Sequence, residues 1–305
     1  MATSSKRVTS QSCRTPGQSL QEYGRGVAGG LMFSLPLLYT MEVWWASFVL
    51  FPWRLMAYMA ATFSLLLAYN RFAGMRRDAT WWECVIDSVE ELGIGIALSA
   101  LVLWLLGRID SKQSFSEIVG RIMIEAMTVA IGVSVGTAQL GGGEGQDDVG
   151  LQSEEDKDAR AADFLSQMAI ALCGGVLFAA NVAPTEEVLV IAQENSAIRL
   201  LAMAIFSLVL GGYVLFFAEF RGSGRYSHPQ NFLNLFRGIV STYAVALFAA
   251  AGTLFFFGRF DGQPLRICIF QMVVLGLPAT LGASAGRLLL QSGNSSGGES
   301  DDGQE

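Results

Sequence analysis

The stretch GGLMFSLPLLYTMEVWW, Gly29 to Trp45, returns later in the chain as GGVLFAANVAPTEEVLV, Gly174 to Val190. Aligned without a gap, the two copies share both glycines, a Phe, a Thr, a Glu two places after the Thr, and a following Val. Each copy therefore carries the same polar pair, which is Thr40 with Glu42 and Thr185 with Glu187. A hydroxyl and a carboxylate repeated within an apolar segment predict a polar site in a membrane protein.

The composition of the chain also indicates a membrane protein. Of its 305 residues, 52% are hydrophobic and only 15% are charged, which is too apolar for a soluble domain of this length. The net charge of −7 comes from acids gathered in residues 144–163 and in the last residues. No basic patch with interleaved aromatic residues indicates nucleic-acid binding. We therefore expect the lipid bilayer as the main partner, and no nucleic acid.

Eight stretches approach the roughly 20 apolar residues that a helix needs to cross a bilayer. They cover residues 27–49, 53–71, 85–106, 118–140, 165–191, 198–219, 236–257 and 265–290. None alternates as a barrel strand does, so helices are the expected spanning form. The predicted fold class is all-α, a polytopic membrane bundle of about eight transmembrane helices.

Similarity between the two halves extends beyond the opening stretch. LWLLGRID, Leu103 to Asp110, matches LFFFGRFD, Leu254 to Asp261, and MTVAIGVSVG from Met127 matches LPATLGASAG from Leu277. Matches at a nearly constant offset predict an internal duplication. Because four helices per half is an even number, the two four-helix repeats are expected to be parallel. Glycines in GIGIALSA and IGVSVG are expected to allow close helix packing.

These features divide the chain into five regions. We predict a polar cytoplasmic tail over 1–25, a first membrane repeat over 26–140, an acidic flexible linker over 141–163, a second membrane repeat over 164–290, and a disordered acidic tail over 291–305. Thirteen of the twenty Lys and Arg residues fall in the N-terminal tail and every second loop. This bias predicts a multi-pass protein of the bacterial inner membrane with both termini in the cytoplasm.

The two shared glutamates are the leading site candidates, because a carboxylate within a span costs on the order of 2–3 kcal/mol. Pro36 and Pro184 should each break a helix and free a carbonyl oxygen, and the segment from Pro184 to Glu187 could restart a half-helix. The result would be an oxygen-rich site for protons or a hard cation. Its candidates are Glu42, Glu187, Glu186, Thr40, Thr185 and Asn181. The alternative is that each Glu only hydrogen-bonds a neighbouring helix.

Three further acids are secondary candidates. Glu90 and Glu91 belong to an acidic run at the start of the third segment, which either complements the helix dipole or forms the cytoplasmic mouth of a cation path. Glu125 lies one turn from Arg121 in the fourth segment, and the two residues form either a structural ion pair or a gate. The second half has Ser241 and Thr242 where the first has Glu90 and Glu91. The charged fourth segment should be shielded inside the bundle.

PLLYTMEVWW near the start and ANVAPTEEVLVIA in the middle resemble the integral membrane proteins of the DUF2391 family. The resemblance covers about residues 26 to 290, and the APTEE element is its most specific part. It implies a prokaryotic inner-membrane protein. No catalytic residue is carried over from the family, so Thr40, Glu42 and the residues from Pro184 to Glu187 are motif positions only.

The sequence therefore favours a secondary transporter or channel for a cation or protons. The alternative is a membrane scaffold or sensor that acts through its acidic linker and tails. We do not expect an enzyme, because the chain has no His cluster, no GxSxG and no HExxH. No cofactor and no metal site are expected.

Overall fold

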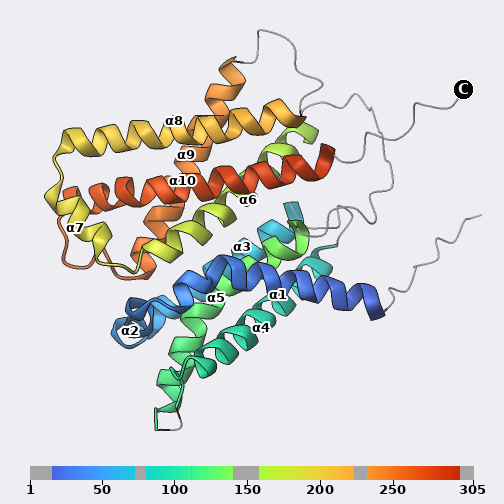
Figure 1. The fold of residues 1–305 in the computed structure, drawn as a ribbon, viewed down its shortest axis with the longest axis vertical. Coiled ribbons are helices and arrows are strands. Elements are labelled where there is room, and N and C mark those ends of the chain that lie inside the picture. The colour runs from blue at the N-terminus through green and yellow to red at the C-terminus, as the bar shows by residue number, and fades with distance from the viewer. Residues whose placement is uncertain (1–15, 73–79, 111, 140–157, 223–231, 296–305) are drawn as a thin grey trace, which may run out of the picture.

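The structure is a computed structural model that describes residues 16–72, 80–110, 112–139, 158–222 and 232–295 (Figure 1). All regular secondary structure in these residues is helical. The helices are α1 (Pro16–Leu38), α2 (Met41–Val49), α3 (Pro52–Phe72), α4 (Trp81–Leu105), α5 (Phe115–Gln139), α6 (Asp158–Val182), α7 (Glu187–Glu194), α8 (Ala197–Gly222), α9 (Phe232–Phe256) and α10 (Leu265–Ser295). The all-α fold class predicted from the sequence is confirmed.

The ten helices form two groups, α1 to α5 and α6 to α10, which lie one above the other in Figure 1. In the first group α5 is central and packs against α1, α3 and α4. In the second group α10 is central and packs against α6, α8 and α9. The groups meet where α6 contacts α1, α3 and α5 and where α9 contacts α3. The long helices therefore occupy corresponding places in the two groups.

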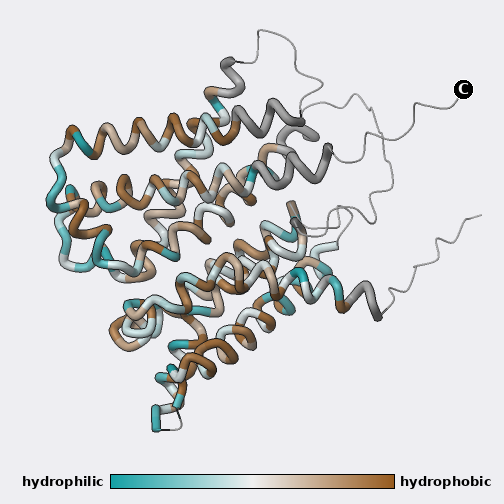
Figure 2. The backbone as a smooth tube through the Cα atoms, viewed as in Figure 1, coloured by the Kyte–Doolittle hydropathy of each residue, from teal (hydrophilic) through white to brown (hydrophobic). Residues whose placement is uncertain are grey.

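Six helices, α4, α5, α6, α8, α9 and α10, are long and apolar enough to cross a membrane. The bent pair of α1 and α2 supplies a seventh crossing if it counts as one span. The remaining predicted stretch, residues 53–71, forms helix α3, which is less apolar than these six. Figure 2 shows hydrophobic residues along the helices and hydrophilic residues gathered at the turns. The chain is thus an integral membrane protein with several apolar helices.

Large apolar side chains cover much of the outside of the bundle. On α8, Ile198 is 80% exposed and Val209 is 63% exposed, and on α9 Phe248 is 68% exposed. A soluble monomer rarely carries apolar surface on this scale, whereas lipid chains cover it readily. By contrast, 72% of the apolar window of α5 is buried, more than in any other candidate span. The prediction that the fourth segment is a shielded helix is confirmed.

Glycines bring the first helix of each group very close to its central helix. A Cβ atom on Gly29 of α1 would lie 2.7 Å from the carbonyl oxygen of Gly132 on α5. A Cβ atom on Gly174 of α6 would clash with the carbonyl oxygen of Gly282 on α10. Gly95 in GIGIALSA is equally tight against α5. Close helix packing was predicted for the glycines of GIGIALSA and IGVSVG, which include Gly95 and Gly132; the close contacts of Gly29 and Gly174, which open the two repeated stretches, were not predicted.

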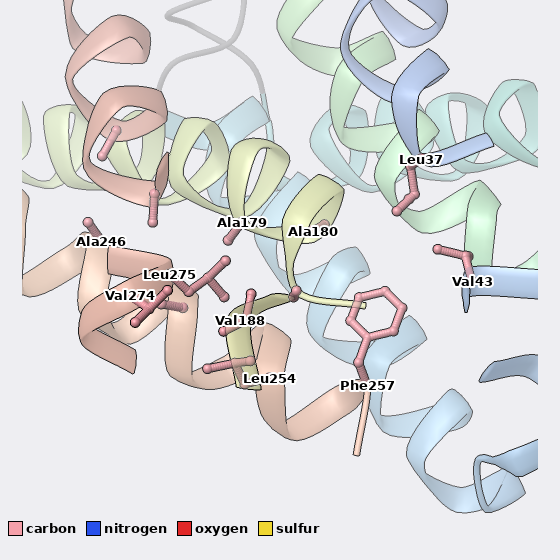
Figure 3. Close-up of a cluster of buried hydrophobic side chains, with 14 of the residues drawn as sticks. Leu37, Val43, Ala179, Ala180, Val188, Ala246, Leu254, Phe257, Val274 and Leu275 are labelled. Atoms are coloured by element: carbon pink, nitrogen blue, oxygen red, sulfur yellow. The ribbon is translucent and has the colours of Figure 1, made fainter. Parts of the chain in front are cut away.

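A core of apolar side chains crosses the boundary between the groups (Figure 3). Leu37 and Val43 come from the first group, and Val188, Phe257 and Leu275 come from the second; all five are at most 7% exposed. The ring of Tyr58 on α3 also packs against that of Phe256 on α9, with centroids 5.1 Å apart. The halves are therefore held together by hydrophobic contacts near the ends of α1, α6 and α9.

Helices extend beyond three of the predicted region boundaries. Helix α1 begins at Pro16 inside the predicted tail 1–25, α6 begins at Asp158 inside the predicted linker 141–163, and α10 continues to Ser295 inside the predicted tail 291–305. A helix can continue through polar residues, because its hydrogen bonds join backbone groups. Hydropathy therefore locates the lipid-facing part of a helix but not the ends of that helix. The rest of the linker and the outer parts of both tails lie outside the described residues.

Candidate functional site

The first repeated stretch contains a sharp helix break. Helix α1 ends at Leu38, α2 begins at Met41, and the two axes differ by 79°. The Thr40 hydroxyl donates to the carbonyl oxygen of Pro36 at 2.7 Å. The Trp44 indole donates to that of Leu38 at 3.2 Å. Carbonyls left open at the end of α1 are thus satisfied by side chains from beyond the break. The predicted break does not occur at Pro36, which lies inside α1, but three residues further on.

The second repeated stretch breaks at the corresponding place. Helix α6 ends at Val182, a turn contains Pro184, and α7 begins at Glu187. The Thr185 hydroxyl donates to the carbonyl oxygen of Val182 at 2.8 Å. The predicted half-helix therefore exists, but it starts at Glu187 rather than at Pro184. Figure 1 shows α2 and α7 at the same end of the bundle, which we call the break end. The opposite end, where α1 begins and α10 ends, is the terminal end.

These breaks change the expected position of the shared glutamates. Straight spans over 27–49 and 165–191 would place Glu42 and Glu187 within the outer part of a crossing helix. Instead Glu42 is half-buried in the first turn of α2, and Glu186 and Glu187 are exposed at the start of α7. The chain turns away from the span before it reaches each carboxylate, so these acids lie at the break end.

A second pair of equivalent features lies at the break end, in the turns that follow α4 and α9. Gly107 has φ of 66° and Gly258 has φ of 70°, the left-handed conformation that glycine adopts readily at a helix C-terminus. The Gln271 side chain donates to the carbonyl oxygen of Arg259 at 3.3 Å. In the first half, Arg121 donates in the same way to the carbonyl oxygen of Arg108. The GRID and GRFD turns therefore share one local geometry.

Arg259 is the basic group on which the repeated acids act. Burial lowers the pKa of its half-buried guanidinium, whereas the nearby carboxylates of Glu186, Glu42 and Glu187 raise it. Glu42 comes from the first half and the other two from the second, so acids of both halves contribute to the electrostatic environment of one cation. We call these four residues the Arg259 group. Arg259 was not predicted to be a site residue. It lies in GRFD, which repeats the earlier GRID, and this repetition could have marked it as a candidate.

The other predicted oxygens serve mainly to hold the backbone. The hydroxyls of Thr40 and Thr185 each donate to a carbonyl at a helix break. The Asn181 amide donates to the carbonyl of Phe33 at 3.0 Å, which ties α6 to α1 across the two halves, and to that of Leu177 at 2.6 Å. Its Oδ1 has no hydrogen-bond partner among the described residues. Within the same residues, no group of three or more His, Cys, Asp and Glu side chains could hold a metal ion.

An ion pair beside the Arg259 group joins the two halves. Arg54 at the start of α3 donates to both carboxylate oxygens of Asp261 at 2.6 and 2.7 Å. This hydrogen bonding, partly opposed by burial, holds the pKa of Asp261 below its usual range. The Arg54 side chain is 11% exposed and that of Asp261 is 56% exposed, so solvent screens the pair.

We expect this ion pair to make stability depend weakly on pH. The pKa of Asp261 is lower in the folded state than in the unfolded state, so the ionised carboxylate stabilises the fold at pH values above its unfolded pKa of about 3.9. This stabilisation is lost as the pH falls through the folded-state pKa. The loss should be at most about 1 kcal/mol for so exposed a carboxylate. Thermal unfolding in detergent at neutral and acidic pH should show a smaller acid sensitivity in Asp261→Asn and in Arg54→Gln than in wild type. Equal acid sensitivity in all three proteins would contradict this role.

A buried polar cluster lies nearer the terminal end of the first half. Glu91 on α4 is 9% exposed, and Asn70 on α3 donates to its Oε2 at 2.9 Å. The same amide nitrogen donates to the Ser88 hydroxyl at 3.0 Å, and the Ser134 hydroxyl on α5 donates to Asn70 Oδ1 at 3.3 Å. We call these four residues the Asn70 cluster. The neighbouring acid Glu90 is exposed and accepts a hydrogen bond from Tyr23, so it lies outside the cluster.

The second half carries a basic residue in the corresponding region. Thr242 on α9, which matches Glu91 in the repeat, accepts a hydrogen bond from Arg287 on α10. Arg287 is 7% exposed and also donates to Gln167 on α6 at 2.7 Å. The first half therefore buries an acid where the second half buries a guanidinium. This difference agrees with the asymmetry between Glu91 and Thr242 in the sequence.

Glu125 is fully buried on α5, and neither of its carboxylate oxygens has a hydrogen-bond partner among the described residues. The ion pair between Glu125 and Arg121 that their spacing suggested is not formed. Arg121 turns toward the break end, where its guanidinium donates to the carbonyl of Arg108 and lies 4.7 Å from the centre of the Phe48 ring. Arg121 thus has its partners near the start of α5 and forms no ion pair with Glu125.

Comparison with known proteins agrees with this architecture. The chain matches the family model described as "Putative integral membrane protein (DUF2391)" over residues 22–290. No curated protein and no solved structure matches the chain. The match includes both repeated stretches, the Arg259 group and the Asn70 cluster. The chain therefore belongs to the DUF2391 family of integral membrane proteins.

Proposed function

We propose that this protein is a secondary transporter or channel for protons or a small cation, and that Glu42 and Glu187 serve at its entrance. The observation that carries the proposal is the pair of helix breaks, which place Glu42 of the first half and Glu186 and Glu187 of the second half at the same end of the bundle (Figure 1), near enough to the half-buried Arg259 to influence its guanidinium. A site built by both halves responds when one half moves against the other, which is the basis of alternating access.

The position of the acids supports an entrance rather than a metal centre. Glu42 and Glu187 lie in the first turns of α2 and α7. Their half-buried and exposed side chains can attract a cation from solution, while Arg259 opposes tight binding of that cation. Glu91 in the Asn70 cluster is a second acid toward the opposite end. Buried acids of this kind in membrane proteins commonly mark ion or proton pathways.

Duplication and orientation complete the proposal. Corresponding helix breaks, glycine contacts and GRID and GRFD turns support two parallel repeats that arose by duplication. The excess of Lys and Arg near the terminal end supports a cytoplasmic location for both chain termini in a bacterial inner membrane. The Arg259 group then faces the outer side of the membrane.

Cation uptake into proteoliposomes tests the role of the Arg259 group. We expect Glu42→Gln and Glu187→Gln each to slow uptake, and the double variant to slow it by about tenfold or more, equivalent to about 1.4 kcal/mol in the barrier. The substitution removes the charge at nearly constant side-chain volume. Initial rates should be measured separately for protons, Na⁺ and K⁺ under an imposed membrane potential.

Glu194→Gln is the matched control, because Glu194 is exposed at the last residue of α7 and lies outside the Arg259 group. Its uptake rate should equal that of wild type. If wild type transports a cation and the double variant transports it equally fast, then the assignment of Glu42 and Glu187 is wrong.

A further inference from the structure

Glu125 occupies the middle of the membrane-spanning part of the first half. It lies ten residues after the start of α5 at Phe115, about 15 Å along the helix and therefore near the midplane of a hydrocarbon core of about 30 Å. Its exposed fraction is 0%. Lipid does not cover this side chain, because α5 is surrounded by α1, α2, α3 and α4.

The surroundings of Glu125 do not compensate a negative charge. Its neighbours Ile124 and Met127 belong to an apolar core together with Leu37 and Val43. An unpaired carboxylate in such a place costs several kcal/mol, whereas a carboxyl group that keeps its proton costs far less. The protein therefore holds a proton at this position more easily than it holds a charge.

Ionisable groups on the elements around Glu125 are directed elsewhere or are weak acids. Tyr58 on α3 is close enough to interact with it electrostatically. Arg121 on α5 points to the break end, Glu42 on α2 acts on the cation of the Arg259 group, and Glu91 on α4 belongs to the Asn70 cluster. None of these residues supplies a positive charge to the Glu125 carboxyl.

The corresponding position in the second half shows that the fold does not require a carboxyl group there. Extending the match between Met127 and Leu277 pairs Glu125 with Leu275, which is also 0% exposed. A leucine thus fills the equivalent place in α10 against the same kind of neighbours. The acid is a special feature of the first half.

Buried polar side chains lie between the level of Glu125 and the terminal end of the first half. The Tyr58 hydroxyl lies 3.3 Å from the Thr128 hydroxyl, one turn along α5 from Glu125. Thr62, one turn beyond Tyr58 on α3, is 2% exposed, and α3 continues from there to the Asn70 cluster. Each of these hydroxyl groups can both donate and accept a hydrogen bond.

We propose that Glu125 is the proton-binding site of the transporter and that the ion carried is the proton. This inference rests on the proposed function and narrows its substrate. A metal cation fits this position poorly, because Na⁺ or Ca²⁺ needs several oxygen ligands, whereas neither carboxylate oxygen of Glu125 has a hydrogen-bonding group within reach among the described residues. A proton needs only one carboxylate oxygen.

Proton uptake into vesicles that enclose a pH-sensitive dye tests the inference, with a K⁺ diffusion potential as the driving force. Glu125→Gln and Glu125→Leu should reduce uptake at least tenfold, to the rate of protein-free vesicles, and Glu194→Gln should leave it unchanged. The leucine variant copies the residue that the chain already uses at position 275, so it provides a second folded test if the glutamine variant is unstable.

Infrared spectroscopy supplies a readout that does not depend on transport. Wild type should show the carbonyl band of a protonated carboxyl group at neutral pH, and that band should survive Glu91→Gln but disappear in Glu125→Gln. If both Glu125 variants fail to fold, the wild-type and Glu91→Gln spectra still decide, because absence of the band in them overturns the inference.

The outcomes separate this inference from the proposed function. Proton uptake that is unchanged in both Glu125 variants overturns the role of Glu125 and leaves a proton transporter. Uptake of Na⁺ or K⁺ without protons overturns the substrate assignment and leaves a cation transporter. No uptake of any of the three ions by wild type overturns the proposed function together with the inference.

Discussion

Gly174→Ala is expected to lower the free energy of unfolding by about 3 kcal/mol. The added methyl group would meet the carbonyl oxygen of Gly282, which belongs to the backbone of α10 and cannot rotate away. Helices α6 and α10 would have to separate, and with them the packing around the helix break at Pro184. Chemical or thermal unfolding of the purified protein in detergent measures the effect.

Gly252→Ala provides the matched control. Gly252 lies in α9, and a Cβ atom on it would meet nothing within 4 Å. Since alanine is the better helix former by about 1 kcal/mol in water, this variant should be as stable as wild type or slightly more stable. Equal stabilities of Gly174→Ala and Gly252→Ala would show that close contact between α6 and α10 does not hold the second half together.

Asn70→Ala is expected to cost about 2–3 kcal/mol, because it removes the donor that binds the buried Glu91 carboxyl at 2.9 Å. The cost should be much smaller in a Glu91→Leu background, where no buried acid is left unpaired. The difference between the two costs, about 1–2 kcal/mol, is the coupling energy of the pair. Unfolding of the four proteins of this double-mutant cycle measures it.

A second cycle with Asn195→Ala and Glu91→Leu serves as the control. Asn195 ends α7, and its amide donates to the carbonyl of Ile191 at 2.9 Å, so it shares no partner with Glu91. The two substitutions should be additive within about 0.5 kcal/mol. A coupling energy near zero between Asn70 and Glu91 would mean that the Asn70 cluster does not stabilise the buried acid.

Local features were predictable from the sequence because they depend on nearby residues. Pro184 predicted a helix break, and the glycines of GIGIALSA and IGVSVG predicted tight helix contacts, since a missing donor or a missing Cβ acts wherever the residue is placed. Apolar lengths predicted the crossing helices for the same reason. These features fixed the fold class and the places where the first helix of each half ends.

Contacts between distant segments were not predictable in this way. The pairing of Glu125 with Arg121 followed from helical spacing, but Arg121 has its partners in the loop that precedes α5 and on α2 instead. Arg259 and Asn70 became visible as site residues only when α7, α9 and α3 had been placed in space. Which side chain meets which across a bundle depends on the rotation and depth of each helix, and one sequence does not specify these quantities.

The two halves share an arrangement of helices but differ in the ionisable side chains that they bury. Glu91 and Glu125 lie in the interior of the first half, where the second half has Thr242 and Leu275. Among the described side chains of the second half, Arg287 is the buried charged residue. In the proposed transporter, the ion therefore crosses the membrane through the first half, and both halves form the entrance through the Arg259 group.

The decisive measurement is the rate at which an imposed membrane potential drives protons, Na⁺ and K⁺ into vesicles that contain wild-type protein. It tests whether the protein transports protons. We expect protons to enter vesicles that contain the protein clearly faster than protein-free vesicles of the same lipid composition. If all three ions enter at the same rates as they enter protein-free vesicles, then the proposed transport function is wrong.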